Sequence, residues 1–175
     1  MIAVAGVGRL SDDEHMLWDL QAVDADFFET APLRFTTSAV LRQPPARVFG
    51  ALGDPAGWGD WFPGFDRSGH WTTDAPPGTG SRRVVRAGRI TFEETIIAWE
   101  APNRFAFRVD RAGVPVARAL AEDYRVAAHP DGSVLEWTFA TDPHAVVRPL
   151  MNLSRPVMQR MFEKAAANLD RHLGA

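Results

Sequence analysis

Alternating apolar and polar residues dominate the middle of the chain and predict β-strands. Phe105, Phe107 and Val109 would share one face of such a strand, because successive side chains in a strand point to opposite sides. Strand-like runs cover residues 33–41, 68–73, 81–87, 89–99, 104–111, 116–128 and 133–141. Short connections, among them one with the hairpin-forming pair Asp131 and Gly132, favour antiparallel neighbours. The pattern therefore predicts an antiparallel sheet of seven strands.

A long helix is predicted in the tail, residues 142–173. Its apolar side chains recur at three- and four-residue steps: Leu150, Leu153, Val157, Met161, Ala165 and Leu169. Asp142 is a candidate N-cap with Pro143 in the first helical position. Pro149 and Pro156 should kink or split the helix.

Three shorter helical pieces are predicted nearer the N-terminus. Residues 1–32 read as an N-terminal extension, in which Ser11 and Glu14 form a capping box. The apolar stripe that follows, Met16, Leu17, Leu20 and Val23, predicts a short helix that packs on the main body or serves dimerisation. Two further short helical segments, residues 46–52 and 56–62, separate the first strand from the others.

These elements predict an α+β domain over residues 33–175, in which a curved sheet wraps one long C-terminal helix. Such a sheet is wider than the helix, so an apolar hollow can remain between them. Length and composition agree with one globular domain, since the chain has 175 residues, of which 46% are hydrophobic and 23% charged. A chain of this length can bury a sizeable hydrophobic core.

Composition also excludes several classes of chemistry. The chain has no cysteine, which rules out disulfides, thiolate metal sites and cysteine nucleophiles. A formal charge of −3 gives no electrostatic reason to expect nucleic acid as a partner. No apolar run is long enough to span a bilayer, and no basic start precedes the apolar N-terminal residues, so we expect a cytoplasmic protein.

Motifs for metals and nucleotides are missing from the sequence. The five histidines are scattered without the spacing of a helical zinc pair. The glycine-rich stretch 75–80 is not followed by the Lys and Ser or Thr of a phosphate-binding loop, and no Gly-x-Ser-x-Gly elbow is present. We therefore predict neither a bound metal nor a cofactor.

An aromatic segment, residues 54–65, includes the helical piece predicted at residues 56–62. Trp58, Trp61, Phe62 and Phe65 stand there among glycines and prolines. Such a segment can pack on the sheet as a plug, or cover a cavity mouth as a lid, and the two interpretations are compatible.

Acidic residues on strands with inward apolar neighbours are candidate functional groups. Glu94 shares a face with Phe92 and Ile96, whereas Glu93 shares one with Ile97 and Trp99, so the sequence leaves open which carboxylate faces inward. An inward Glu94 could act as an acid or base, or form an ion pair with an arginine such as Arg82 or Arg86.

The neighbouring strand adds two more polar groups. Glu122 has the same parity as Tyr124 and so is also a candidate for the inner face. A buried Tyr124 would need a hydrogen-bond partner and could bind a ligand. The basic cluster Arg82, Arg83, Arg86 and Arg89 reads first as a solvated strand face, one member of which could reach an anionic group of a ligand.

Several segments resemble the SRPBCC superfamily, and its polyketide cyclase/dehydrase branch with a START-like helix-grip fold. They are residues 44–49, 54–63, 78–83, 94–96, 101–105 and 132–137, with Pro115, within a resemblance that covers about residues 33–173. The resemblance implies a cavity for a hydrophobic small molecule between the sheet and the C-terminal helix. It transfers no catalytic residue.

Three functional hypotheses follow. The first is binding of an apolar small molecule such as a lipid or polyketide-like compound. The protein could act as a monomer or as a homodimer. The second is a cyclase or dehydratase that uses Glu94 as acid or base, with Tyr124 orienting a carbonyl. The third is a protein-interaction module. The expected ligand-binding side chains are Trp58, Trp61, Phe62, Phe65, Phe92, Ile96, Phe105, Phe107, Tyr124, Trp137, Phe139, Leu153, Val157 and Met161.

Overall fold

The computed structural model describes residues 9–10 and 16–175. Its elements follow the chain in the order β1 (Arg9–Leu10), β2 (Met16–Asp19), α1 (Phe27–Thr30), β3 (Leu33–Leu41), α2 (Pro45–Leu52), α3 (Trp58–Trp61), β4 (His70–Trp71), β5 (Arg82–Ala87), β6 (Ile90–Glu100), β7 (Arg104–Ala112), β8 (Ala117–His129), β9 (Gly132–Pro143), α4 (Arg148–Leu153) and α5 (Arg155–Leu173). The predicted α+β class is confirmed.

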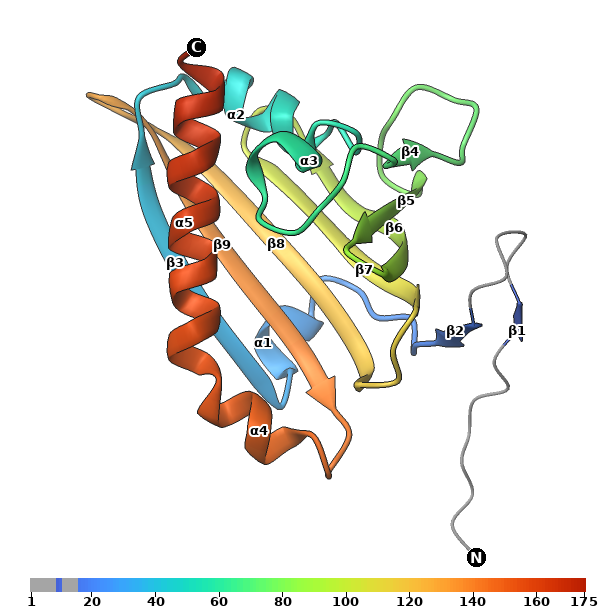
Figure 1. The fold of residues 1–175 in the computed structure, drawn as a ribbon. Coiled ribbons are helices and arrows are strands. Elements are labelled where there is room, and N and C mark those ends of the chain that lie inside the picture. Colours follow the sequence, from blue (N-terminus) through green and yellow to red (C-terminus); the bar gives the residue numbers. More distant parts are fainter. Residues whose placement is uncertain (1–8, 11–15) are drawn as a thin grey trace, which may run out of the picture.

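Seven of the strands form the main antiparallel sheet, in the order β3-β9-β8-β7-β6-β5-β4. The long helix α5 lies across one face of this sheet, with α2 and α3 beside it, whereas α1 lies against the opposite face (Figure 1). The helix-grip architecture predicted from the sequence is therefore confirmed.

The β8–β9 hairpin provides the longest strand pair and turns where the sequence predicts. Gly132 has a φ of +139°, and a Cβ atom there would lie 2.3 Å from the backbone oxygen of Leu41. Only glycine tolerates both conditions. The turn residue thus allows the end of β3 to approach the hairpin closely.

The N-terminal helix predicted around Met16 to Val23 is wrong for the described residues. Met16–Asp19 is a strand, β2, in which Trp18 pairs with Ala112 of β7. The paired register of β7 and β8 ends at Arg108 and Ala121, so the last part of β7 has a free edge that β2 occupies. An open strand edge outcompetes a weak local helical stripe. The capping box at Ser11 and Glu14 lies outside the described residues.

The tail differs from the prediction at its start. Asp142 and Pro143 are the last residues of β9 and do not cap a helix. The helical part is split, as the prolines predict: Pro149 lies in the first turn of α4 and Pro156 in the first turn of α5. Proline is tolerated in the first turn because those amides have no partner within the helix.

The face of the sheet opposite α5 is closed by small side chains. Ala98, Ala106, Ala121 and Ala140 are all buried there and form one hydrophobic cluster with Phe28 of α1. Alanines allow the short helix to approach the strands closely. The large aromatic side chains of the same strands must then point to the α5 face, where the main core lies.

Candidate functional site: a cavity between the sheet and the terminal helix

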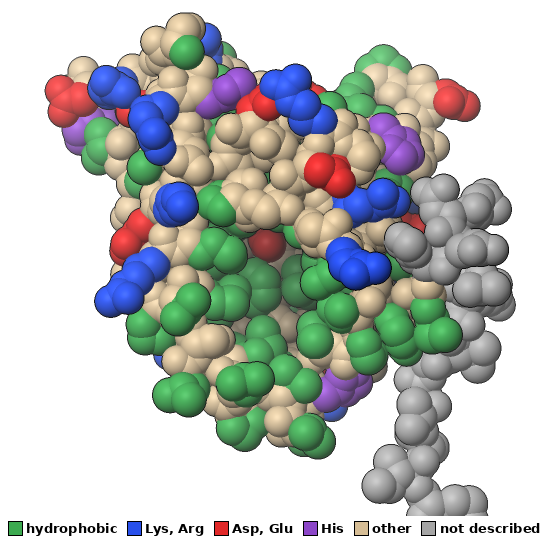
Figure 2. All heavy atoms as spheres, in the orientation of Figure 1, with side chains coloured by type: hydrophobic (Ala, Val, Ile, Leu, Met, Phe, Trp, Pro, Cys, Tyr) green, Lys and Arg blue, Asp and Glu red, His purple; other side chains and the backbone are tan. Residues whose placement is uncertain are grey.

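A cavity of about 200 Å³ lies between the inner face of the sheet and the first half of α5. Figure 2 shows a hollow on this face of the molecule, with hydrophobic side chains around it and an acidic side chain at its floor. Its walls are formed by Trp58, Phe62, Pro63, Phe65, Ala87, Phe92, Glu94, Phe107, Val109, Leu120, Glu122, Phe139, Met158, Met161 and Phe162. The lining is thus aromatic and aliphatic apart from two carboxyl groups.

Strand alternation explains how the sheet supplies its share of the walls. Phe107 and Val109 point inward from β7, and Leu120 and Glu122 point inward from β8. Each pair is two residues apart, as one face of a strand requires. The helix α5 faces them with Met158, Met161 and Phe162.

The aromatic segment after α2 closes one end of the cavity. Trp58 stacks on Phe62, with ring centroids 5.6 Å apart, and Phe65 packs on Phe62 at 4.7 Å. The Trp58 indole N–H also donates a hydrogen bond of 3.0 Å to the backbone oxygen of Leu52. Trp58 is therefore a fixed wall, as in the plug interpretation, while its ring still borders the cavity.

An irregularity of β6 at Ile97 allows both Glu94 and Trp99 to face inward. The register of β6 against β7 shifts between Glu93 and Glu94, and again between Ile96 and Ala98. Glu94 is buried and lines the cavity, whereas Glu93 forms an ion pair with Arg111. The second shift returns Trp99 to the inner face, where it packs on Phe49. The first shift leaves Asp110 of β7 out of the paired register, whereas the second leaves out Ile97 of β6. Only the second shift reverses the parity along β6, which explains why simple alternation could not assign it.

Glu94 forms a fully buried ion pair with Arg83. The Nε of Arg83 donates to a Glu94 carboxylate oxygen at 2.7 Å, and its Nη1 donates to the backbone oxygen of Leu52 at 3.2 Å. The guanidinium lies over the ring of Trp58, 4.5 Å from the centroid. Burial raises the pKa of Glu94, and the charge of Arg83 opposes that rise. Arg83 therefore holds Glu94 in place as part of the protein's own structure.

Glu122 has a different environment. One of its carboxyl oxygens, Oε2, accepts hydrogen bonds from the Tyr124 hydroxyl and from the Trp137 indole N–H, the latter at 2.9 Å. Burial raises the pKa of Glu122 to about 7; the hydrogen bond from Tyr124 opposes the rise, and the nearby charge of Glu94 adds to it. A carboxyl group in this cavity therefore exchanges its proton near neutral pH.

Tyr124 stays protonated at the pH values near 7 at which Glu122 exchanges its proton. Burial, and next the charge of Glu122, raise its pKa well above the ordinary value of 10. Its hydroxyl is therefore a permanent donor to Glu122. Tyr124 positions the carboxyl group from behind the cavity wall and is not itself among the lining residues.

The predicted ligand-binding residues fall into three groups in the structure. Those that line the cavity are Trp58, Phe62, Phe65, Phe92, Phe107, Phe139 and Met161. Those buried in the adjoining core are Trp61, Ile96, Phe105, Tyr124 and Trp137. Leu153 and Val157 do neither, since they are 80% and 67% exposed. The two predicted catalytic residues also lie in different places: Glu94 lines the cavity, and Tyr124 lies behind its wall.

The predicted set leaves out several lining residues, which come from the aromatic segment, from β5, β7 and β8, and from α5: Pro63, Ala87, Val109, Leu120, Glu122, Met158 and Phe162. Alternation indicates the inner face for Val109 and Glu122, because they share parity with Phe107 and Tyr124. No local signal marks Met158 or Ala87. Their place depends on how the helix and the β5–β6 hairpin pack.

A larger cleft, of about 840 Å³, lies beside β5, β6 and β7 and is lined mainly by charged residues. Several of these charges neutralise one another: Arg111 pairs with Glu93 at 2.8 Å, and Arg108 pairs with Asp110 at 2.7 Å. The charges of these two pairs are thus already compensated within the protein. The apolar cavity is therefore the better candidate site.

Two further observations concern the part of the chain that the structure describes. It contains no group of three or more histidine, aspartate or glutamate side chains arranged to hold a metal ion. None of its helices combines the length and the apolar character that crossing a bilayer requires.

Comparison with known proteins places the chain in a family. Residues 32–174 match the sequence pattern of the family described as polyketide cyclase / dehydrase and lipid transport. The chain belongs to this family. The match covers the whole sheet-and-helix domain, so the resemblance to the SRPBCC superfamily is confirmed.

A related protein matches a longer part of this chain, and its name identifies no ligand. An uncharacterized protein of Mycobacterium tuberculosis is 34% identical over 160 residues, which cover 91% of this chain and 95% of the relative. Because that alignment is longer than residues 33–175, part of the N-terminal segment has a counterpart there.

Solved structures share the fold at low sequence identity. The ginseng major latex-like protein 151 from Panax ginseng has a TM-score of 0.63 at 12% identity, covering 80% of this chain and 96% of that one. DynU16, a protein from the dynemicin biosynthetic locus, has a TM-score of 0.61 at 17% identity, covering 81% of this chain and 47% of that one. These likenesses show the fold alone.

Proposed function

We propose that the protein binds a hydrophobic small molecule whose ring-sized apolar part occupies the cavity between the sheet and α5. One observation supports this most directly: the space beneath the helix is not filled by the protein's own side chains, and its lining is apolar except for Glu94 and Glu122. Water gains few hydrogen bonds in such a site, so an apolar ligand replaces it favourably.

The volume limits the ligand. An engineered apolar cavity of about 150 Å³ can hold benzene, whereas sites for drug-sized molecules commonly measure about 300–1,000 Å³. A cavity of about 200 Å³ accommodates one substituted ring or a short branched chain. A lipid or polyketide-like compound would place one end inside, with the remainder at the mouth of the hollow (Figure 2).

Binding can be tested with a probe of matched size. Ethylbenzene should bind the wild-type protein and raise its unfolding temperature, because a ligand that binds only the folded state stabilises it. Leu120→Trp should abolish the shift by filling the cavity. Leu153→Trp should keep it, because Leu153 is exposed and outside the lining.

A second measurement searches for the natural ligand. Native mass spectrometry and organic extraction of the purified protein should recover an apolar compound from the wild type and from Leu153→Trp, but not from Leu120→Trp. If neither ethylbenzene nor any extracted compound associates with the wild-type protein, the proposed function is wrong. Circular dichroism establishes that the Leu120→Trp variant is folded.

Acid–base catalysis of a cyclisation or dehydration is a second candidate function, favoured by the carboxyl group of Glu122 with its pKa of about 7. Because Arg83 holds Glu94, we assign the proton-transfer role to Glu122 and not to Glu94. Compounds extracted from Glu122→Gln should then differ from those of the wild type by one water or by a ring closure. Identical compounds from both proteins would leave binding as the function.

A further inference from the structure

The two oxygens of the Glu122 carboxyl group have different surroundings. Both hydrogen bonds that Glu122 accepts, from Tyr124 and Trp137, end on Oε2. Glu122 is one of the residues that line the cavity, and its side chain is only partly buried. The other oxygen, Oε1, is therefore the atom left for whatever occupies the cavity.

Hydrogen bonding also determines where a proton on Glu122 resides. Oε2 already accepts two donors, and Tyr124 remains protonated, so a proton added to the carboxyl group belongs on Oε1. In this form Oε1 is a hydrogen-bond donor on a residue that lines an apolar space. In the ionised form the same atom is an acceptor.

The charges around Glu122 come from a small number of groups. Glu94 on β6 raises its pKa and Arg83 on β5 lowers it, while Tyr124 is the titratable neighbour on its own strand. The lining residues from α5, namely Met158, Met161 and Phe162, carry no charge, nor do Trp58, Phe62 and Phe65 from the aromatic segment. Glu122 and Glu94 are therefore the two groups of the cavity wall whose charge can change with pH, and Glu94 is paired with Arg83.

No other side chain in the lining can donate a hydrogen bond to the ligand without changing its present contacts. Trp58 donates its indole N–H to Leu52, and Glu94 accepts from Arg83. The remaining lining residues are apolar. Among the lining side chains, Glu122 is therefore the one that can satisfy a ligand oxygen, since an unpaired buried polar atom is costly.

We propose that Oε1 of protonated Glu122 is the polar subsite of this cavity and that it selects ligands carrying a carbonyl oxygen on a ring-sized apolar body. This proposal rests on the proposed binding function and names the class of ligand. Aromatic ketones are the simplest members of the class. An isolated carbonyl fits because it is an acceptor without a proton of its own.

The experiment compares two probes of nearly the same shape, acetophenone and ethylbenzene, by calorimetric titration at pH 5.5 and pH 8.5. Only the protonated fraction of Glu122 donates to the ketone. With a pKa of about 7, acetophenone should bind the wild type about 30-fold more weakly at pH 8.5 than at pH 5.5. Ethylbenzene has no acceptor and should show a clearly smaller change.

Two variants separate the hydrogen bond from the shape of the site. Glu122→Gln keeps an oxygen for Tyr124 and Trp137 and presents an amide N–H₂ to the cavity, so acetophenone should bind it equally at both pH values. Glu122→Leu removes the donor and should weaken acetophenone about tenfold at pH 5.5, with little effect on ethylbenzene. Glu136→Gln, at an exposed position on β9, is the matched control and should behave as the wild type.

The outcomes distinguish the subsite from the cavity. If Glu122→Leu weakens both probes equally, or if acetophenone binds more tightly at pH 8.5, the carbonyl subsite is wrong while apolar binding stands. If neither probe binds the wild type at either pH, the proposed function fails as well. Should Glu122→Leu not fold, the pH profile of Glu122→Gln decides alone: a remaining 30-fold change overturns the proposal.

Discussion

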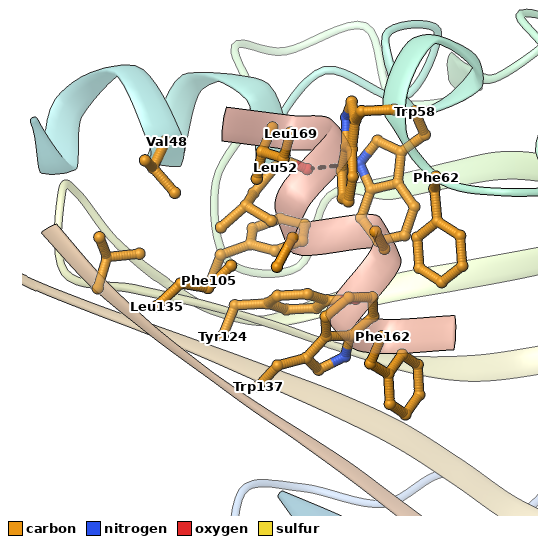
Figure 3. Close-up of a cluster of buried hydrophobic side chains, with 14 of the residues drawn as sticks. Val48, Leu52, Trp58, Phe62, Phe105, Tyr124, Leu135, Trp137, Phe162 and Leu169 are labelled. Atoms are coloured by element: carbon orange, nitrogen blue, oxygen red, sulfur yellow. Dashed lines mark hydrogen bonds between the residues drawn. The ribbon is translucent and has the colours of Figure 1, made fainter. Parts of the chain in front are cut away.

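The two ends of the space between the sheet and α5 differ in how they are filled. At the C-terminal end of the helix, Leu169 packs with Val48, Leu52 and Leu135, which are all at most 2% exposed (Figure 3). At the N-terminal end, Met158 and Met161 are only partly buried and border the cavity. One helix on one sheet thus provides a solid core at one end and a hollow at the other.

The difference depends on what the rest of the chain adds. The helix α2 contributes Val48, Phe49 and Leu52 to the filled end, where they occupy the space beside α5. The opposite end receives α4, which has no buried residue. The hollow therefore persists because no side chain is supplied to fill it, and stability and ligand binding are expected to depend on different ends of one helix.

The largest expected effect is at the filled end. Leu169→Ala should lower the free energy of unfolding by about 3–5 kcal/mol, because it removes a fully buried side chain and leaves a void. Met158→Ala, at the hollow end, should cost less than about 1.5 kcal/mol, because its neighbourhood is already open. Denaturant unfolding of both variants measures the two losses of unfolding free energy. Equal losses would show that the two ends are packed alike.

The next effect concerns the carboxyl group of the hollow end. The ordinary pKa of Glu122 is 4.5 and burial raises it to about 7, so the folded state binds its proton more tightly than the unfolded state. The contribution of this group to stability is complete below pH 4.5 and is lost as the pH rises through 7. The loss amounts to about 3 kcal/mol at 1.36 kcal/mol for each pKa unit.

Glu122→Gln removes this titration. The free energy of unfolding of Glu122→Gln, minus that of the wild type, should increase by about 3 kcal/mol between pH 4.5 and pH 8. Urea unfolding at several pH values measures the difference, and Glu136→Gln should show no such slope. A difference that stays constant with pH would mean that Glu122 titrates as an exposed carboxylate does.

The smallest effect is expected on the outer side of the helical segment at the hollow end. Leu153→Gln should change the free energy of unfolding by less than about 0.5 kcal/mol, because Leu153 is 80% exposed. Thermal unfolding of Leu153→Gln, with Leu169→Ala measured in parallel as the destabilised reference, tests this. A loss above 1 kcal/mol would indicate that Leu153 is covered in solution, for example by a second copy of the chain.

Local patterns predicted the regular elements well where one face of an element is buried. The strand predicted at residues 33–41 is observed with the same bounds, and the short helix predicted at 46–52 begins one residue earlier. The prediction fails where a tertiary contact overrides a weak pattern. At Met16 the free edge of β7 converts a helical stripe into a strand.

The candidate site was only partly predictable for the same reason. Alternation places Phe107 and Phe139 in the lining, but it could not choose between Glu93 and Glu94, because a register shift at Ile97 reverses the parity of β6 between Ile96 and Ala98. It also could not separate Arg83 from the other arginines of its hairpin. Arg83 is fully buried because Glu94 and the ring of Trp58 meet it from other elements.

The amino-acid sequence by itself determined the architecture, because hydrophobic periodicity and turn residues act over a few neighbouring positions. It specified the antiparallel sheet, the split terminal helix and an inner face rich in aromatic side chains. Only the tertiary structure decided that the core is filled at Leu169 and open at Met161. It also decided that Arg83 pairs with Glu94, while Glu122 accepts both of its hydrogen bonds on Oε2. Volumes and proton affinities of this kind depend on distances between elements far apart in the chain, and no local pattern encodes those distances.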